Sequence, residues 1–176
     1  VEGLPFDLLG PDPADFQRRV AGVIAEHGAG ILGPSFNKER WHLALLRSGS
    51  GDDERAVWID YDTGGRHGHA DALNIGLFAK GLDLMPDLGY PPVQYGGGWA
   101  GPKALWYRRT AAHNTVAVDG RDQKMTSPEV TGGRTTLWAL GETLKAIRVS
   151  APEAGGVERF ERTVALVDVS PADSYV

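Results

Sequence analysis

Cysteine is absent from this chain of 176 residues, which excludes a disulfide framework and any metal site built on thiolates. Positive charge is in deficit, because 18 lysines and arginines stand against 23 aspartates and glutamates. We therefore expect no nucleic-acid partner, since nucleic acids require a clustered basic face. No apolar run approaches the roughly 20 residues of a spanning helix, so we expect no membrane partner. An acidic polysaccharide is compatible with this charge, because a few cations in one cleft can outweigh the global sign.

Glycine and proline are frequent, with 24 and 11 residues, and they separate short segments rich in valine, threonine, tryptophan and tyrosine. This pattern is typical of an all-β body. One helix is expected near the start, where Asp12-Pro13-Ala14-Asp15 resembles a helix N-terminus and Gly28 a stop. Alternating segments predict the strands, at 41–46, 56–61, 73–79, 104–108, 115–118, 135–140, 144–149 and 159–169. The sequence thus predicts a mostly β fold, an antiparallel double-sheet β-sandwich with one N-terminal helix.

Both ends of the chain suggest a piece of a longer protein. Val1 is not preceded by a methionine or a signal-like segment, and an apolar β-prone run begins at Asp173–Val176. We expect residues 1–40 to form a helix and a connector that leads from a preceding domain. Residues 41–176 are expected to form the β-sandwich, with further chain beyond them.

Histidines and carboxylates gather in one region. Three of the five histidines lie at His67, His69 and His113, with Asp71 and Asp87 between them. Imidazole and carboxylate are the usual ligands of zinc where thiolate is absent, so a metal site is the first hypothesis. In an extended segment His67, His69 and Asp71 would share one face. A regular hairpin at Lys80-Gly81 would still leave Asp87 about 13 Å from His69, so the His-Gly-His segment is expected to curl back or bulge at Gly68.

The ordered motifs resemble a known family. They are Tyr61-Asp62-Thr63-Gly64-Gly65-Arg66-His67-Gly68-His69-Ala70-Asp71-Ala72-Leu73-Asn74, then Pro86-Asp87-Leu88-Gly89-Tyr90, then Ala112-His113-Asn114-Thr115-Val116-Ala117-Val118-Asp119-Gly120. Over residues 41 to 125 the chain is similar to the heparinase II/III-like polysaccharide lyases, which include oligo-alginate lyases. The ordered set is much more specific than a single His-x-His.

The resemblance implies a structural zinc held by His69, Asp87 and His113, and a catalytic role for His67. It implies β-elimination on a uronic-acid polysaccharide, of the alginate or glycosaminoglycan type, in a cleft shared with a preceding α/α toroid. That toroid, absent from these residues, would supply further active-site groups, so the fragment alone is expected to be inactive. Tyr107 is a second catalytic candidate, with a half-buried strand position as the structural alternative.

Three further residues are candidates for substrate binding: Arg66, Tyr95 and Trp99. The negative net charge and the lack of basic clusters favour a less sulfated polymer such as alginate. Lyases of this type usually work outside the cytoplasm, so a periplasmic or secreted location is expected.

Two alternatives stay open at this stage. One is a cupin-like metal-dependent enzyme, in which a small double-sheet barrel holds a catalytic metal open to solvent. The other is a non-catalytic carbohydrate-binding β-sandwich, in which Tyr95, Trp99 and Trp106 stack on sugars and any metal is structural. Replacement of His67 separates the binder from the lyase, because only the lyase would lose its rate.

Overall fold

A computed structural model describes residues 13–28, 33–63, 68–89, 100–125, 132–170 and 173–176. The chain divides into two compact units, Val1–Gly33 and Pro34–Val176. In the first unit, helix α1 spans Pro13–His27. Asp15 in its first turn pairs with Arg18 and Arg19, and Gly28 ends the helix with a φ of 80°. The predicted helix and its stop are confirmed.

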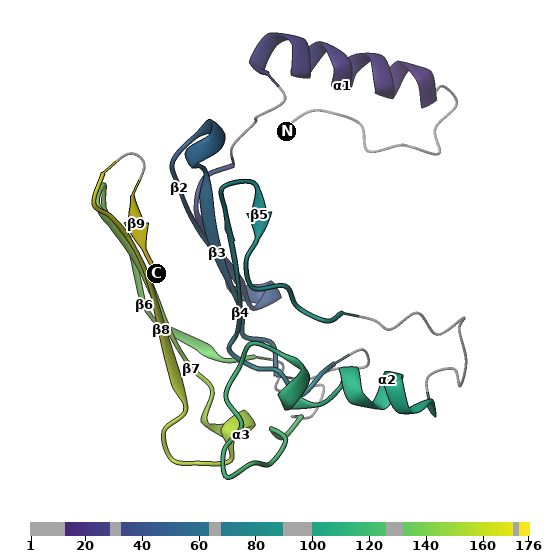
Figure 1. Ribbon diagram of the computed structural model, residues 1–176, viewed down its shortest axis with the longest axis vertical. Coiled ribbons are helices and arrows are strands. Elements are labelled where there is room, and N and C mark those ends of the chain that lie inside the picture. Colours follow the sequence, from purple (N-terminus) through teal and green to yellow (C-terminus); the bar gives the residue numbers. More distant parts are fainter. Residues whose placement is uncertain (1–12, 29–32, 64–67, 90–99, 126–131, 171–172) are drawn as a thin grey trace. The chain divides into compact units, whose positions relative to one another are not determined.

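The second unit contains two antiparallel sheets (Figure 1). The first has the strand order β1-β2-β3-β4-β5 and the second β6-β7-β8-β9. The strands of the first sheet are β1 (Phe36–Lys38), β2 (Leu43–Ser48), β3 (Arg55–Asp60), β4 (Asn74–Ala79) and β5 (Leu82–Asp83). Those of the second are β6 (Arg134–Leu140), β7 (Leu144–Ser150), β8 (Glu161–Asp168) and β9 (Ser174–Tyr175). The double-sheet fold expected from the sequence is confirmed.

The core is formed by alternate residues of the inner strands. These residues point inward because side chains alternate between the two faces of a strand. Buried members come from both sheets: Ala44, Leu46, Val57, Ile59, Ile147, Val149, Val164 and Leu166. Full burial of one such aliphatic side chain contributes roughly 1.5–3 kcal/mol, so this cluster is the main force that holds the sheets together.

A buried ion pair also joins the sheets. Arg55 on β3 is 5% exposed, and its Nη2 lies 2.7 Å from Oδ1 of Asp168 on β8. Lys145 and Ser48 also donate to Asp168. Burial alone would raise the pKa of Asp168, but these hydrogen bonds hold the pKa below its usual value. Charges this far from water persist only when they are paired.

Three segments differ from the sequence prediction. Residues 104–108 form no strand, because Pro102 at the first helical position starts helix α2 (Pro102–Tyr107). The strand predicted at 115–118 is absent. Val118 makes only an isolated bridge with Arg121, across a tight turn at Asp119-Gly120 where both φ values are positive. The strand expected from residue 41 begins at Leu43, since Glu39–Trp41 form a 3₁₀ turn (η1).

Two more short helical segments complete the described secondary structure relevant to the site, η5 (Thr110–Ala112) and α3 (Pro152–Gly155). Among the described residues, no helix is both long and apolar enough to cross a membrane.

Candidate metal centre

The candidate site lies where β4 begins. His69 and Asp71 stand in the loop before β4, Asp87 follows β5, and His113 follows η5. Residues 68–73 form no strand, so the expected extended arrangement of His69 and Asp71 is wrong. Leu73, with a φ of 61°, turns the chain into β4 instead. His67 and Arg66 lie outside the described residues, as do Tyr95 and Trp99.

A bulge in the returning strand sets the position of Asp87. Lys80 and Gly81 form a two-residue turn with φ values of 53° and 73°, so Ala79 pairs with Leu82. Immediately afterwards the amides of Leu84 and Met85 both donate to the carbonyl of Leu77, at 2.8 and 3.3 Å. Leu84 and Met85 thus lie opposite the single residue Leu77. Such a bulge reverses the faces on which the following side chains, including that of Asp87, would otherwise lie. This irregularity lies on the side of the hairpin opposite Gly68, and the chain is also irregular over the described residues 68–73, as the sequence predicted.

His113 is the centre of the cluster. Its side chain is fully buried, and its Nε2 lies 2.7 Å from the carbonyl oxygen of Tyr107. A carbonyl can only accept, so Nε2 carries the proton and Nδ1 faces the carboxylates. Nδ1 lies 2.8 Å from Oδ1 of Asp87 and 3.8 Å from Oδ2 of Asp71. This tautomer is the one that a metal-binding Nδ1 requires.

His69 and Asp71 complete a possible metal-binding group. The ring centroids of His69 and His113 are 5.0 Å apart. One ligand atom each from His69, Asp71 and His113 lies within 4.8 Å of the others. Asp71, which the sequence placed on one face with His69, therefore also reaches His113. Two imidazoles and two carboxylates in one partly buried place match the donor set that zinc accepts.

The electrostatics favour a cation at this site. Burial, together with the nearby charges of Asp87 and Asp62, raises the pKa of Asp71 to about 6, against the opposing effect of His113. Burial lowers the pKa of His69, and the charge of His113 adds to this effect. A neutral His69 can donate its lone pair to a metal, and a dication would relieve the repulsion between the carboxylates.

Asp60 gives a pH-dependent prediction for the metal-free chain. Burial, together with the charges of Asp71, Asp62 and Asp87, raises its pKa to about 7, although the hydrogen bond from the amide of Asp62 opposes the rise. Because the folded pKa lies above the unfolded value of about 3.9, its contribution to stability is complete below pH 4 and is lost as the pH rises through 7. Asp60→Asn should therefore stabilise the chain at pH 8 in chelator, by on the order of 2 kcal/mol, and change little at pH 4.

Urea unfolding of both proteins at the two pH values measures this effect. Asparagine can still accept the hydrogen bond from the amide of Asp62, which is 3.0 Å from Oδ1 of Asp60. Asp52→Asn, on an exposed turn, serves as the control. Equal stabilisation at both pH values would contradict the titration of Asp60.

Side-chain amides join the loops that carry the candidate ligands. Oδ1 of Asn74, which is 1% exposed, accepts the backbone amide of Asn114 at 3.0 Å. Nδ2 of Asn114 in turn donates to the carbonyls of Met85 and Pro86, at 3.2 and 3.1 Å. The two asparagines thus fix His113 and Asp87 relative to β4. Asn114 directly follows His113 and Asn74 ends the first motif, which was the available signal for them.

Other supporting residues were missed by sequence reasoning. Oγ1 of Thr110 donates to the carbonyl of Ala70 at 2.6 Å, and Nε2 of Gln123 donates to that of Ala72 at 3.2 Å. Nη1 of Arg162, on β8, donates to the carbonyls of Leu73 and Asn114 at 2.5 and 2.8 Å. Their partners are backbone atoms far away in the chain, and the sequence carries no local signal for such contacts.

The comparison with known proteins shows the family. Residues 56–167 match the family model of heparinase II/III-like proteins, C-terminal region. The chain belongs to the heparinase II/III-like family. These proteins include polysaccharide lyases, so this membership favours the lyase interpretation over a cupin-like enzyme.

Individual proteins are similar to this chain in sequence or in fold. The chain is 30% identical over 151 residues to an exo-oligoalginate lyase from Saccharophagus degradans, which covers 79% of this chain and 20% of that protein. A mutant of the heparan sulfate lyase HepC from Pedobacter heparinus superposes with a TM-score of 0.69 at 22% identity, over 88% of this chain and 25% of that one. A heparinase III gene product gives 0.65 at 21% identity, over 87% of this chain and 24% of that one. The chain thus spans about a fifth to a quarter of these relatives.

Tyr107 differs from its expected position in this heparinase II/III-like domain. It lies in α2 and not on a strand, because Pro102 starts a helix there. Its side chain is half-buried, and its backbone carbonyl is the group that holds Nε2 of His113. The structure therefore gives Tyr107 a direct contact with the candidate metal centre through its main chain.

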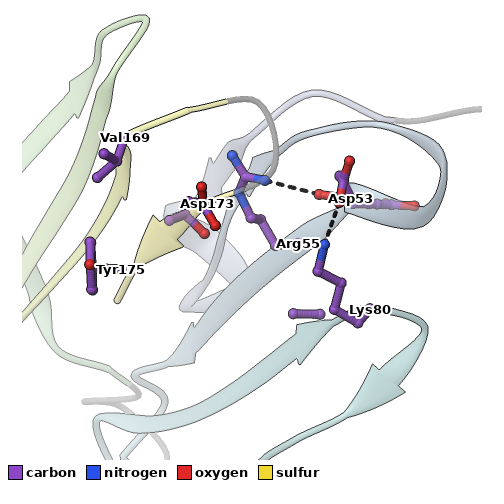
Figure 2. A pocket seen from close by; sticks show the side chains of 9 residues that line it. Asp53, Arg55, Lys80, Val169, Asp173 and Tyr175 are labelled. Atoms are coloured by element: carbon purple, nitrogen blue, oxygen red, sulfur yellow. Dashed lines mark hydrogen bonds and ion pairs between the residues drawn. The ribbon is translucent and has the colours of Figure 1, made fainter.

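A cavity at the other end of the sandwich is distinct from this centre. It has a volume of about 410 Å³ and is lined by residues that include Asp53, Arg55, Lys80 and Tyr175. Figure 2 shows Lys80 pointing to Asp53, with which it forms an ion pair. Arg55 and Ala79 are paired at one end of the β3–β4 ladder, whereas Asp60 and Asn74 are paired at the end that carries the histidines. Lys80 is paired with Asp53, and Arg55 is paired with Asp168 on β8, so these charges are engaged within the protein.

Proposed function

We propose that this chain is the β-sandwich part of a polysaccharide lyase that cleaves uronic-acid-containing polysaccharides by β-elimination. The observation that carries the proposal is the partly buried cluster of His69, Asp71, Asp87 and His113 within a heparinase II/III-like domain. Tested by their chemistry, these residues fit a zinc ion. His69, Asp87 and His113 would hold it, with Asp71 within reach as an additional carboxylate.

The metal would supply positive charge that fixes the three ligand-bearing loops, and it would take no direct part in bond breaking. The protein's own groups prepare this role. The carbonyl of Tyr107 orients His113, and Asn114 ties the loop of Asp87 to β4. Loss of these supports would disorder the cleft wall even if every ligand were present.

In β-elimination a base removes the proton at C5 of a uronate while the C4–O4 bond breaks. The electron pair of the C5–H bond forms the C4–C5 double bond, and the leaving oxygen takes a proton from an acid. The negative charge that develops on the C6 carboxylate must be stabilised, and this is expected to be the largest catalytic contribution. We assign proton transfer next to C5 to His67, two residues before His69, and protonation of the leaving oxygen to Tyr107. Arg66, Tyr95 and Trp99 are proposed to contact the substrate.

The proposal includes a second domain. An α/α toroid outside these residues would provide the opposite wall of the cleft and the remaining active-site groups. The small share of the relatives that this chain covers supports that interpretation. The substrate is proposed to be an acidic polysaccharide with little sulfation, such as alginate, since the net charge is -5 and basic residues form no cluster in the sequence. A periplasmic or secreted location would suit such a polymer.

The isolated chain should bind zinc without cleaving substrate, because it lacks the toroid's groups. The whole protein should release unsaturated uronate from alginate or from a glycosaminoglycan, which is followed by the ultraviolet absorbance of the product. His67→Ala in the whole protein should abolish this release and leave zinc content unchanged. Activity of the isolated chain, or full activity of the His67 variant, would contradict the assignment. Unchanged sugar binding with no cleavage in any form would favour the carbohydrate-binding sandwich.

A further inference from the structure

A second site is suggested by an open groove of about 630 Å³, which we name the Trp41 groove. Its lining residues come from β1, η1 and β6: Asn37, Lys38, Glu39, Arg40, Trp41 and Trp138. β1 and β6 are terminal strands in the orders of the two sheets, so the groove follows one edge of the sandwich. Asn37 crosses this edge and donates to Oγ1 of Thr135 at 3.0 Å, which holds the groove's two sides together.

The local backbone keeps one large aromatic ring in solvent. Trp41 ends the 3₁₀ turn η1, and His42 follows in the left-handed conformation with a φ of 52°. The next residue, Leu43, starts β2, so the indole cannot join the alternating inward face of that strand. Trp41 is 72% exposed, while Trp138 packs partly against the core. A rigid, exposed indole beside a second indole offers a flat surface for stacking.

Cations accompany this ring. Nζ of Lys38 lies 5.1 Å from the ring centroid of Trp41 and 5.2 Å from that of Phe36. Arg40 directly precedes Trp41 and is exposed. Within the part of the chain that the structure describes, neither Lys38 nor Arg40 forms an ion pair with a carboxylate. Glu39 is the groove's single anionic lining residue, so the groove is locally positive in a chain with a net charge of -5.

We propose that the Trp41 groove is a second binding site for acidic carbohydrate chains. The C–H face of a pyranose would stack on the indole of Trp41, and the sugar carboxylates would pair with Lys38 and Arg40. Stacking needs a ring with an apolar face, and the two cations select a charged one. This combination fits a uronate oligosaccharide better than a neutral glycan or an apolar protein segment.

The strand register places this groove at the same end of the sheet as the candidate metal centre. Lys38 pairs with Leu43, Leu43 with Asp60, and Asp60 with Asn74, in one row across four strands. Three strand spacings amount to about 14 Å. A short oligosaccharide can cover that length. The inference rests on the proposed function only for the class of sugar, because none of the groove residues belongs to the candidate metal centre.

Calorimetric titration of the 176-residue chain with tetramannuronate tests the proposal, with cellotetraose as the neutral probe. Trp41→Ala should weaken tetramannuronate binding roughly 3- to 10-fold, and Trp41→Phe should restore part of the loss. The double variant Lys38→Gln, Arg40→Gln should weaken binding and reduce its dependence on salt. Tyr175→Ala is the matched control, because Tyr175 is 70% exposed and lies on β9 away from the groove.

Each outcome decides the matter. Binding that is lost in the groove variants and kept in His113→Ala supports a site independent of the metal centre. Unchanged binding in both groove variants overturns the proposal and leaves the zinc and lyase assignments standing. Equal affinity for cellotetraose overturns the acidic class of ligand. A dimer in sedimentation that Trp41→Ala dissociates, without a change in sugar affinity, would make the groove an interface between two copies and would also overturn it.

Discussion

Replacement of His113 by alanine is expected to abolish stoichiometric zinc binding. His113 donates from Nε2 to the carbonyl of Tyr107, so its Nδ1 is fixed toward Asp87 and Asp71. Affinity should fall by more than about 100-fold, because loss of an outer partner of a ligand already costs about 10- to 100-fold. Zinc at about 100 times its dissociation constant should stabilise the unaltered chain by about 2.7 kcal/mol, and the variant should lose this stabilisation.

Competition with a chromophoric chelator and elemental analysis of the dialysed protein would measure the loss. His27→Ala provides the matched control, because His27 is an exposed histidine of α1 beside Glu26. Circular dichroism in chelator would establish that both variants are folded. One zinc per chain at unchanged affinity in the His113 variant would show that the metal, if bound, lies elsewhere.

Arg162→Met should weaken zinc binding about 10- to 100-fold although Arg162 is not a ligand. The guanidinium comes from β8 and bonds two carbonyls, Leu73 after Asp71 and Asn114 after His113. Burial lowers its pKa, but an arginine keeps its charge, and each charge-assisted bond is worth about 1.5–3 kcal/mol. Without it, the two ligand-bearing loops lose their common anchor and two partly buried carbonyls lose a donor.

The variant's metal affinity must be separated from its general stability. Zinc affinity would be measured at a temperature where the metal-free variant is fully folded, and unfolding in chelator would be measured alongside. Arg162→Lys should recover part of the affinity, because one ammonium can reach one carbonyl. The control is Arg148→Met on the neighbouring strand β7, where an exposed Arg148 contacts Thr163. A lower melting temperature with an unchanged zinc affinity would reduce Arg162 to a purely structural residue.

Local patterns predicted the main elements well. Alternation over 56–61 and 144–149 corresponds to β3 and β7, and Gly28 ends α1 as expected. These features depend on interactions between residues that are close together in the chain, so the local sequence is enough to predict them. The segment 104–108 was predicted incorrectly, because its apolar and aromatic residues suit a strand while Pro102 favours a helix. The fixed φ angle of Pro102, which suits the first position of a helix, outweighed the preference of these side chains for a strand.

The candidate site was predicted only in part. The motifs indicated His69, Asp87 and His113, and the structure brings His113 within 2.8 Å of Asp87. Asp71 was expected on a common strand face with His69, yet it joins the cluster from an irregular loop. Asp87 is positioned by the bulge in which the amides of Leu84 and Met85 both donate to the carbonyl of Leu77. No sequence motif indicates this bulge. A single inserted residue moves the following side chains to the other face of the sheet. The pairing of this segment with β4 therefore required the structure and could not be inferred from the sequence.

The sequence by itself determined the kinds of donor in the metal centre, the two-sheet fold and the family, because residue types and their spacing are properties of the chain. Only the tertiary structure decided that Asp71 approaches His113, that Tyr107 holds His113 through its main chain, and that Arg162 joins two loops from the other sheet. These contacts join residues up to 89 positions apart. Their existence depends on how strands pair and how sheets pack, and packing is a property of the whole fold.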